Sequence, residues 1–210
     1  MKLVNSFLDT CRNAVRSVMR EVAKGLNNFT GGKLSPNAVT IFGLLMHIPI
    51  ALLIAKGYFG YGAVLLVIFG LFDTLDGELA RLQKRASAAG MLLDASTDRM
   101  KEVLLYTGVA YALASSGRVH AIAWVVAACG FSICVSYVKA KGEMAMKDSD
   151  LSANEINRLF ADGLMRFEVR MFLLVVGLAT DRLLPVIIFI AVLSVYTALT
   201  RLVRISRKLT

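Results

Sequence analysis

The sequence contains few of the residues that form zinc sites or disulfide frameworks, with only three cysteines and two histidines among 210 residues. No two cysteines form a CxxC pair and no pair of histidines lies near them, so we expect the thiols to pack rather than bind metal. Each histidine stands alone in or beside an apolar run, which favours a packed or interfacial side chain over a metal ligand. These residues are Cys11, Cys129, Cys134, His47 and His120.

The sequence also lacks polar segments long enough to build a soluble domain beside its apolar runs. The amino terminus has neither the central apolar run nor the cleavage site of a signal peptide, so none is expected. Apolar residues instead make up 57% of the chain, and the mean hydropathy is +0.64. These values exceed what a soluble domain of this length needs for its core, and they indicate a membrane protein.

Six mostly apolar runs are each long enough to cross a hydrocarbon core of ~30 Å at ~1.5 Å per residue. Gly, Ser and charged residues separate the runs, as they do at helix ends. We therefore predict an all-α integral membrane protein with six transmembrane helices. The runs cover about 38–55, 59–80, 92–115, 119–138, 165–180 and 183–200.

An amphipathic helix is predicted ahead of the first run. Apolar residues recur every three or four positions from Leu3 to Leu26, and a basic stripe follows another face from Arg12 to Lys24. We expect this helix to lie in the membrane interface, and a soluble helix packed on another domain is the alternative. The predicted division of the chain is then a juxtamembrane helix over 1–32 and a transmembrane catalytic domain over 33–210.

The lysines and arginines are distributed unevenly among the predicted loops. With six spans and both termini on one side, all but three of the 24 basic residues fall on that side, the exceptions being Lys56, Arg118 and Arg182. The positive-inside rule makes this side cytoplasmic. The net charge of +9 therefore reports topology and contact with anionic membrane lipids, and it is not a sign of nucleic-acid binding.

Four aspartates crowd the hairpin between the second and third runs: Asp73, Asp76, Asp94 and Asp98. At 100° per residue, Asp73 and Asp76 share one face of the second helix, and Asp94 and Asp98 share one face of the third. The short link LQKRASAA makes these helices antiparallel neighbours, so the two carboxylate pairs can face one another near the cytoplasmic end of the hairpin.

Carboxylates this close need positive charge, because two unit charges ~4 Å apart repel by about 4 kcal/mol at an effective dielectric near 20. Two divalent cations can supply it, and an all-carboxylate ligand set favours hard ions, Mg²⁺ or Mn²⁺, over Zn²⁺. One alternative is a buried ion-pair network with Arg81, Arg85 and Arg99. Another is a divalent-cation transporter, which would place acids near mid-membrane along several helices.

The same stretch matches the pattern D-x2-D-G-x2-A-R-x8-G-x3-D-x3-D and therefore resembles the CDP-alcohol phosphatidyltransferase family. Its eight fixed positions are Asp73, Asp76, Gly77, Ala80, Arg81, Gly90, Asp94 and Asp98. The segment SPNAVTIFGL resembles the P-N-x-x-T element that opens the family's first span. The six-span topology of the family agrees with the six predicted helices.

The resemblance implies an enzyme that cleaves the pyrophosphate of a CDP-linked lipid such as CDP-diacylglycerol, moves the phosphatidyl group to an alcohol and releases CMP. It implies that Asp73, Asp76 and Asp94 hold two metal ions, and that Asp98 also touches metal and acts as general base. Contacts to the CDP portion are implied for Pro36, Asn37, Ala38, Val39, Gly77, Arg81 and Ser87.

The second half of the chain resembles the inositol-phosphate-using branch of the family in the segments DASTDR, SYVKAKGE and GLMRFEVR. We expect Lys139, Arg170 and Arg201 to form a cationic pocket for a phosphorylated acceptor, unless they are ordinary positive-inside residues at helix ends. Inositol 1-phosphate is the expected acceptor. Glycerol 3-phosphate, as in phosphatidylglycerophosphate synthases, and the archaeal ether-lipid reaction on inositol phosphate are the alternatives. A homodimer is implied by the resemblance alone.

Overall fold

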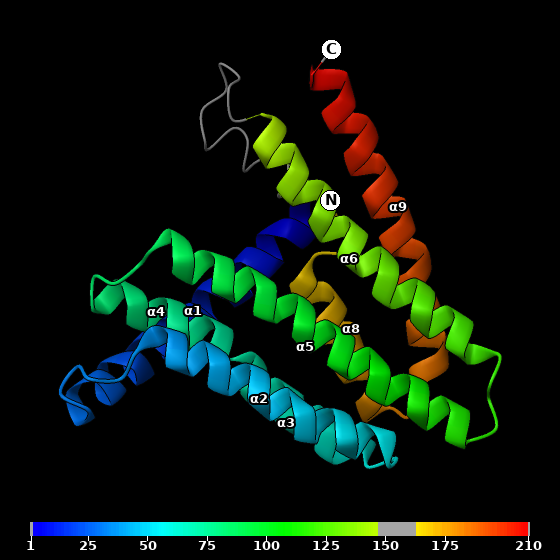
Figure 1. Cartoon of the computed structure of the whole chain (residues 1–210), viewed down its shortest axis with the longest axis horizontal. Coiled ribbons are helices and arrows are strands. Elements are labelled where there is room, and N and C mark those ends of the chain that lie inside the picture. Colours follow the sequence, from blue (N-terminus) through cyan, green and yellow to red (C-terminus); the bar gives the residue numbers. More distant parts are fainter. Residues whose placement is uncertain (1, 147–162, 210) are drawn as a thin grey trace. The chain divides into compact units, whose positions relative to one another are not determined.

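The computed structural model describes residues 2–146 and 163–209, and every regular element in that part of the chain is a helix. Figure 1 shows their arrangement along the chain. The helices are α1 (Lys2–Phe29), α2 (Pro36–Ala55), α3 (Phe59–Gly70), α4 (Phe72–Leu82), α5 (Ala88–Ser115), α6 (Ala121–Ala145), α8 (Phe167–Ala179) and α9 (Leu183–Leu209).

Three of these helices are long and apolar enough to cross a membrane: Pro36–Ala55, Ala121–Ala145 and Leu183–Lys208. The structure therefore confirms an all-helical membrane protein, while the count of six spans stays a prediction. The run predicted over 59–80 differs from expectation, because it is divided into α3 and α4 at Leu71. Glycine is a weak helix former, and Gly70 immediately precedes this interruption.

The chain divides into two compact units, which are described separately. The first comprises 1–52 and 64–105, and the second comprises 53–63 and 106–210. The first unit contains α1, α4 and the charged first part of α5, so all four aspartates belong to it. The second unit contains α6, α8 and α9.

The core of the first unit lies where α1 packs against α4. Ala23 of α1 and Leu79 of α4 are fully buried there, together with Leu75 and with Val39 of α2. This is the apolar face of α4, opposite the face that carries the aspartates. Part of the apolar surface of α1 stays uncovered, since Val18 is 58% exposed. The predicted interfacial position of α1 agrees with that exposure and stays a prediction.

In the second unit, α9 packs along α6 and against α8. Ala128 of α6, Leu174 of α8 and Ile187 of α9 are fully buried in this packing. The contact between α8 and α9 is close because a Cβ added to Gly177 would lie 3.1 Å from Cβ of Val186. A methyl group at residue 177 would require Val186 to shift by a few tenths of an ångström.

Candidate active site

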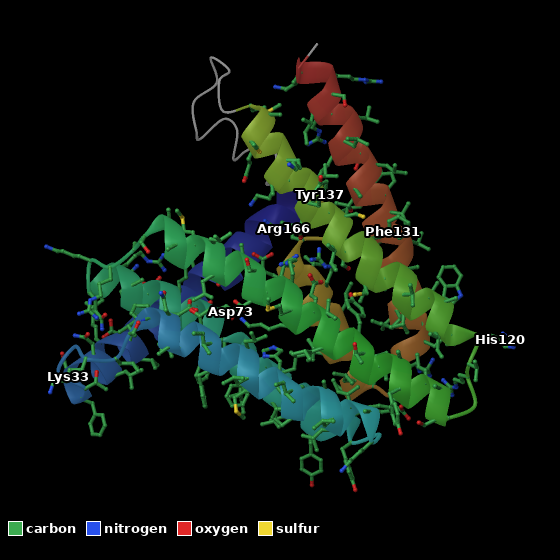
Figure 2. The ribbon with its side chains drawn as sticks, viewed as in Figure 1. Lys33, Asp73, His120, Phe131, Tyr137 and Arg166 are labelled. Carbon is green, nitrogen blue, oxygen red and sulfur yellow. The ribbon has the colours of Figure 1, made fainter. Side chains whose placement is uncertain are left out.

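The structure brings three of the four predicted aspartates together. Asp73 of α4, labelled in Figure 2, and Asp94 and Asp98 of α5 each offer a carboxylate oxygen, and these oxygens lie within 4.8 Å of one another. All three side chains are partly exposed, so a solute can reach them. An all-oxygen donor set of this spacing fits a hard divalent cation.

Asp76 lies outside this three-residue group and is almost fully buried. Its carboxylate accepts a hydrogen bond of 2.5 Å from the hydroxyl of Thr40 on α2. Thr40 is the threonine of the P-N-x-x-T element, so the contact joins the two segments that carry the resemblance. The sequence analysis did not assign a role to Thr40, although its place in that element was a usable signal.

A buried lysine lies beside the cluster. The ammonium group of Lys101 is ion-paired with Asp73 and lies 3.5 Å from a carboxylate oxygen of Asp98. Its side chain is 1% exposed. The ion-pair alternative in the sequence analysis considered arginines and overlooked this lysine. The signal was present, because Lys101 is two turns after Asp94 and so shares its helix face.

One of the three arginines considered does contact an aspartate. Arg99 lies 3.5 Å from Asp98 and 2.9 Å from the buried carboxylate of Glu102, which offsets its charge. Asp73 thus pairs with Lys101 and Asp98 pairs with both Lys101 and Arg99, whereas Asp94 has no basic partner among these ion pairs. The three aspartates and Glu102 outnumber Lys101 and Arg99 in these ion pairs, and this excess of negative charge suits a divalent cation.

The predicted CDP contacts on α2 and α5 lie around Gly90. A Cβ added to Gly90 would lie 3.3 Å from the hydroxyl of Ser87 and 3.6 Å from the amide oxygen of Asn37. Ser87 also caps α5, because its hydroxyl accepts a hydrogen bond of 3.1 Å from the backbone N–H of Gly90. The amino end of α2 therefore lies beside the amino end of α5.

The first turn of α2 begins at the buried Pro36. The backbone N–H groups of Ala38 and Val39 donate to the carbonyl of Ser35, at 3.1 and 3.3 Å. Ala38 is exposed, whereas Val39 is in the core between α1 and α4.

Arg81 lies over Gly77, with its guanidinium 3.5 Å from the position that a Cβ would take there. One of its nitrogens donates to Glu78 at 2.6 Å. Glu78 is 4% exposed and was not singled out in the sequence analysis. The guanidinium therefore lies against the helix, within van der Waals contact of residue 77.

The predicted acceptor residues belong to the second unit, and two of them hold the same segment. Arg170 is fully buried and donates to the carbonyl of Met165 at 2.5 Å. Arg201 is 6% exposed, donates to the carbonyl of Val135 at 3.2 Å, and lies against Gly163, where an added Cβ would be 2.7 Å from its Nη2. Both guanidinium groups are thus fixed beside residues 163–165.

Lys139 differs from these two arginines. Its side chain is 48% exposed and lies 3.7 Å from Glu143, one turn along α6. Arg201 interacts electrostatically with both Arg170 and Glu143.

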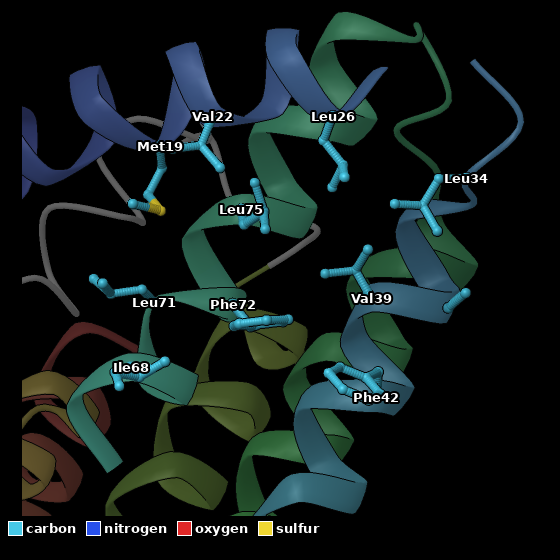
Figure 3. A pocket seen from close by; sticks show the side chains of 11 residues that line it. Met19, Val22, Leu26, Leu34, Val39, Phe42, Ile68, Leu71, Phe72 and Leu75 are labelled. Atoms are coloured by element: carbon cyan, nitrogen blue, oxygen red, sulfur yellow. The ribbon is translucent and has the colours of Figure 1, made fainter. Parts of the chain in front are cut away.

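An apolar groove of ≈ 630 Å³ lies within the first unit (Figure 3). Met19, Val22 and Leu26 project into it from α1, toward Phe72 and Leu75 of α4. Its lining is apolar throughout, which suits a hydrocarbon chain. The sequence analysis did not predict the groove, which exists because α1 docks on α4. The remaining lining residues are Leu34, Ala38, Val39, Phe42, Ile68 and Leu71.

Comparisons with known proteins agree with these observations. Residues 33–198 match the family described as CDP-alcohol phosphatidyltransferase. The chain is 32% identical over 140 residues to a phosphatidylinositol phosphate synthase of Cutibacterium acnes, covering 65% of each chain. It is 31% identical over 180 residues to a phosphatidylinositol phosphate synthase of Corynebacterium glutamicum, covering 81% of this chain and 77% of the relative.

The comparison with solved structures also finds a phosphatidylinositol phosphate synthase. The fold is similar to that of Mycobacterium tuberculosis phosphatidylinositol phosphate synthase with CDP-DAG bound, with a TM-score of 0.76 and 26% identity. The alignment covers 90% of this chain and 94% of that one. The same protein in complex with manganese and citrate also matches with a TM-score of 0.76.

Proposed function

The chain belongs to the CDP-alcohol phosphatidyltransferase family, and from this premise we propose that it transfers the phosphatidyl group of CDP-diacylglycerol to inositol 1-phosphate. The products are phosphatidylinositol phosphate and CMP. The observation that carries the proposal is the cluster of Asp73, Asp94 and Asp98, placed on two neighbouring helices by the family's own spacing. The names of the relatives support the acceptor.

The cofactor is Mg²⁺ or Mn²⁺, bound as two ions by Asp73, Asp76, Asp94 and Asp98. The spacing of the three clustered oxygens and their excess negative charge support this assignment. The manganese complex of the structural relative supports it as well. When bound, divalent cations neutralise the diphosphate and orient it for in-line displacement.

Asp98 acts as the general base. One of its oxygens takes the proton of the acceptor hydroxyl while the hydroxyl oxygen attacks the phosphorus that carries the diacylglycerol. The bond from that phosphorus to the oxygen of CMP breaks, and CMP leaves. Lys101 at 3.5 Å and Arg99 at 3.5 Å hold the carboxylate of Asp98 in place for this step.

The CDP-lipid binds along the first unit, with its diphosphate near the aspartates. Gly77, Arg81 and Ser87 contact the CDP portion, together with the first turn of α2 from Pro36 through Asn37 and Ala38 to Val39. The groove supports this placement, because Ala38 and Val39 also line it. A lipid could therefore extend one acyl chain along the groove while its head group stays at the helix ends.

The acceptor phosphate binds to Lys139, Arg170 and Arg201. The fixed geometry of the two buried arginines supports this role, since a guanidinium held by a backbone carbonyl loses little freedom on binding a phosphate.

The remaining parts of the proposal are the membrane topology, the orientation of the active site and the oligomeric state. We propose six membrane spans in the domain over 33–210, a juxtamembrane helix over 1–32, an active site facing the cytoplasm, and a homodimer. The one-sided distribution of lysine and arginine supports the orientation.

The test is CMP release by purified protein in detergent with CDP-diacylglycerol and Mg²⁺. Inositol 1-phosphate, inositol, glycerol 3-phosphate and serine are offered separately, and Asp98→Asn is the control. We expect release with inositol 1-phosphate alone and none from the control. Release with glycerol 3-phosphate instead would keep the active site and overturn the acceptor. No release with any alcohol, from protein shown to be folded, would overturn the proposal.

A further inference from the structure

Glu78 is a buried carboxylate surrounded by three arginines. Its Oε1 accepts a hydrogen bond of 2.6 Å from Arg81 on the same helix and lies 3.9 Å from Nε of Arg16 on α1. Its Oε2 accepts a hydrogen bond of 3.4 Å from Nε of Arg20, also on α1. We call Glu78, Arg16, Arg20 and Arg81 the Glu78 cluster.

Glu78 lies between the aspartate face of α4 and the face of α4 that packs against α1. At 100° per residue it falls between Arg81, at the edge of the aspartate face, and Leu75, on the face that packs against α1. Its side chain is 4% exposed, whereas those of the three arginines are about half exposed, from 48 to 61%. The acid is therefore the fixed centre of the cluster.

Packing alone does not explain an acid at this position. Burying a carboxylate costs free energy unless it is paired, and an apolar side chain would fill the same space between α4 and α1 without that cost. Both oxygens of Glu78 are used by cations from two helices. The arrangement holds the guanidinium groups in place and also ties α1 to α4.

The most constrained of these guanidinium groups is that of Arg81. It lies against Gly77 and bonds to Glu78 at one nitrogen, yet its side chain is 49% exposed. A free arginine side chain has several rotatable bonds, and ordering it on binding an anion costs conformational entropy. Glu78 removes that cost in advance because it holds the guanidinium in one place with an accessible edge.

We propose that Glu78 is a positioning residue for the CDP-lipid: it orders Arg81 for the diphosphate. Arg16 and Arg20 hold Glu78 from the other side, so α1 takes part in substrate binding in addition to its place at the membrane. The inference rests on the proposed function, in which Arg81 contacts the CDP portion.

The test is a double-mutant cycle on binding of CDP-diacylglycerol to protein in detergent. We expect Glu78→Gln to weaken binding about ten-fold, since the negative charge that strengthens the hydrogen bond from Arg81 is lost. In the Arg81→Ala background the same substitution should change binding less than about two-fold, because the group it positions is gone. A ten-fold loss that persists in that background would overturn the proposal.

The matched control is Glu21→Gln. Glu21 is on α1 and, like Glu78, pairs with a basic residue, Lys24 at 2.7 Å, but its side chain is 69% exposed. We expect wild-type binding from this variant. Arg20→Gln keeps Glu78 and Arg81 intact, and we expect it to weaken binding by a smaller factor than Glu78→Gln. If Glu78→Gln does not fold, Arg20→Gln and Glu78→Asp carry the test, and wild-type binding by both would contradict the proposal.

Steady-state kinetics separate this inference from the proposed function. We expect Glu78→Gln to raise the KM for CDP-diacylglycerol and to leave kcat and the KM for inositol 1-phosphate unchanged. Equal changes in both KM values would indicate a general structural defect and overturn the positioning role. If the wild-type protein binds CDP-diacylglycerol but transfers to no alcohol, the proposed function is wrong. The double-mutant cycle on binding would still decide the role of Glu78 in that case.

Discussion

Replacing the buried Lys101 by methionine should destabilise the protein in a way that added metal repairs. Lys101 is the basic residue paired with Asp73, and its ammonium lies 3.5 Å from Asp98. The Lys101→Met variant leaves the clustered carboxylates without that charge. At an effective dielectric near 20, one pair at this distance amounts to about 5 kcal/mol, and breaking a buried pair typically costs about 3–5 kcal/mol net.

The assay is thermal unfolding of purified protein in detergent, in EDTA and then in Mn²⁺. A loss of about 3 kcal/mol corresponds to a fall in Tm of about 6–12 °C for a chain of this size. We expect this fall in EDTA. Bound Mn²⁺ supplies the missing positive charge and stabilises the folded state by mass action, so the difference from wild type should shrink by more than half.

Lys33→Met is the control, because Lys33 is exposed and lies in the turn before α2. We expect its Tm to match that of the wild type in both conditions. An equal fall in Tm for Lys101→Met with and without metal would show that a bound ion does not replace the charge of the lysine. No fall in EDTA would show that the carboxylates are not held by this charge, and either result would refute the reasoning.

The other predictions concern single contacts. Asp94→Asn removes the negative charge of one of the three clustered carboxylates, so CMP release should fall about 10²-fold or more, and a wild-type rate would exclude it as a ligand. Thr40→Val removes the hydrogen bond to Asp76, which should cost about ten-fold in kcat/KM at unchanged expression; an unchanged value would show that this bond does not position Asp76. Gly163→Ala places a methyl group 2.7 Å from Arg201. It should raise the KM for inositol 1-phosphate about ten-fold and not the KM for CDP-diacylglycerol, and equal rises would count against the acceptor pocket.

The cluster of Asp73, Asp94 and Asp98 could be predicted from sequence because it depends on residues that are close together in the chain. Helical periodicity puts Asp94 and Asp98 on one face, and a short link makes the neighbouring helix with Asp73 antiparallel to it. The structure brings these three together. Asp76 shares the face of Asp73 but is tied to α2 by Thr40, a contact between segments far apart in sequence that a helical wheel does not contain.

The basic partners of the aspartates were harder to predict, because a helical wheel shows which way a side chain points but not how far it extends. Arg81 is at the edge of the aspartate face, yet its guanidinium turns to Glu78. Lys101 has the length to reach back across to α4, where it pairs with Asp73. Glu78 itself occupies a position that the family pattern leaves open, so its role becomes visible only once α1 is docked beside it.

The division at Leu71 could not be predicted, because the apolar run continues through it without a charged residue or a proline. The groove escaped prediction for a related reason. Its lining comes from α1, α2, α3 and α4 and depends on how these helices pack, whereas apolar periodicity identifies each face separately.

The most direct test of the account is to identify the lipid that the protein makes. CDP-diacylglycerol and inositol 1-phosphate are supplied with Mg²⁺, and the lipid fraction is analysed by mass spectrometry for the wild type and for Asp98→Asn. The account predicts phosphatidylinositol phosphate in stoichiometric amount with CMP from the wild type, and neither product from the variant. CMP accompanied by phosphatidic acid alone, or equal product from both proteins, would contradict transfer to this acceptor through Asp98.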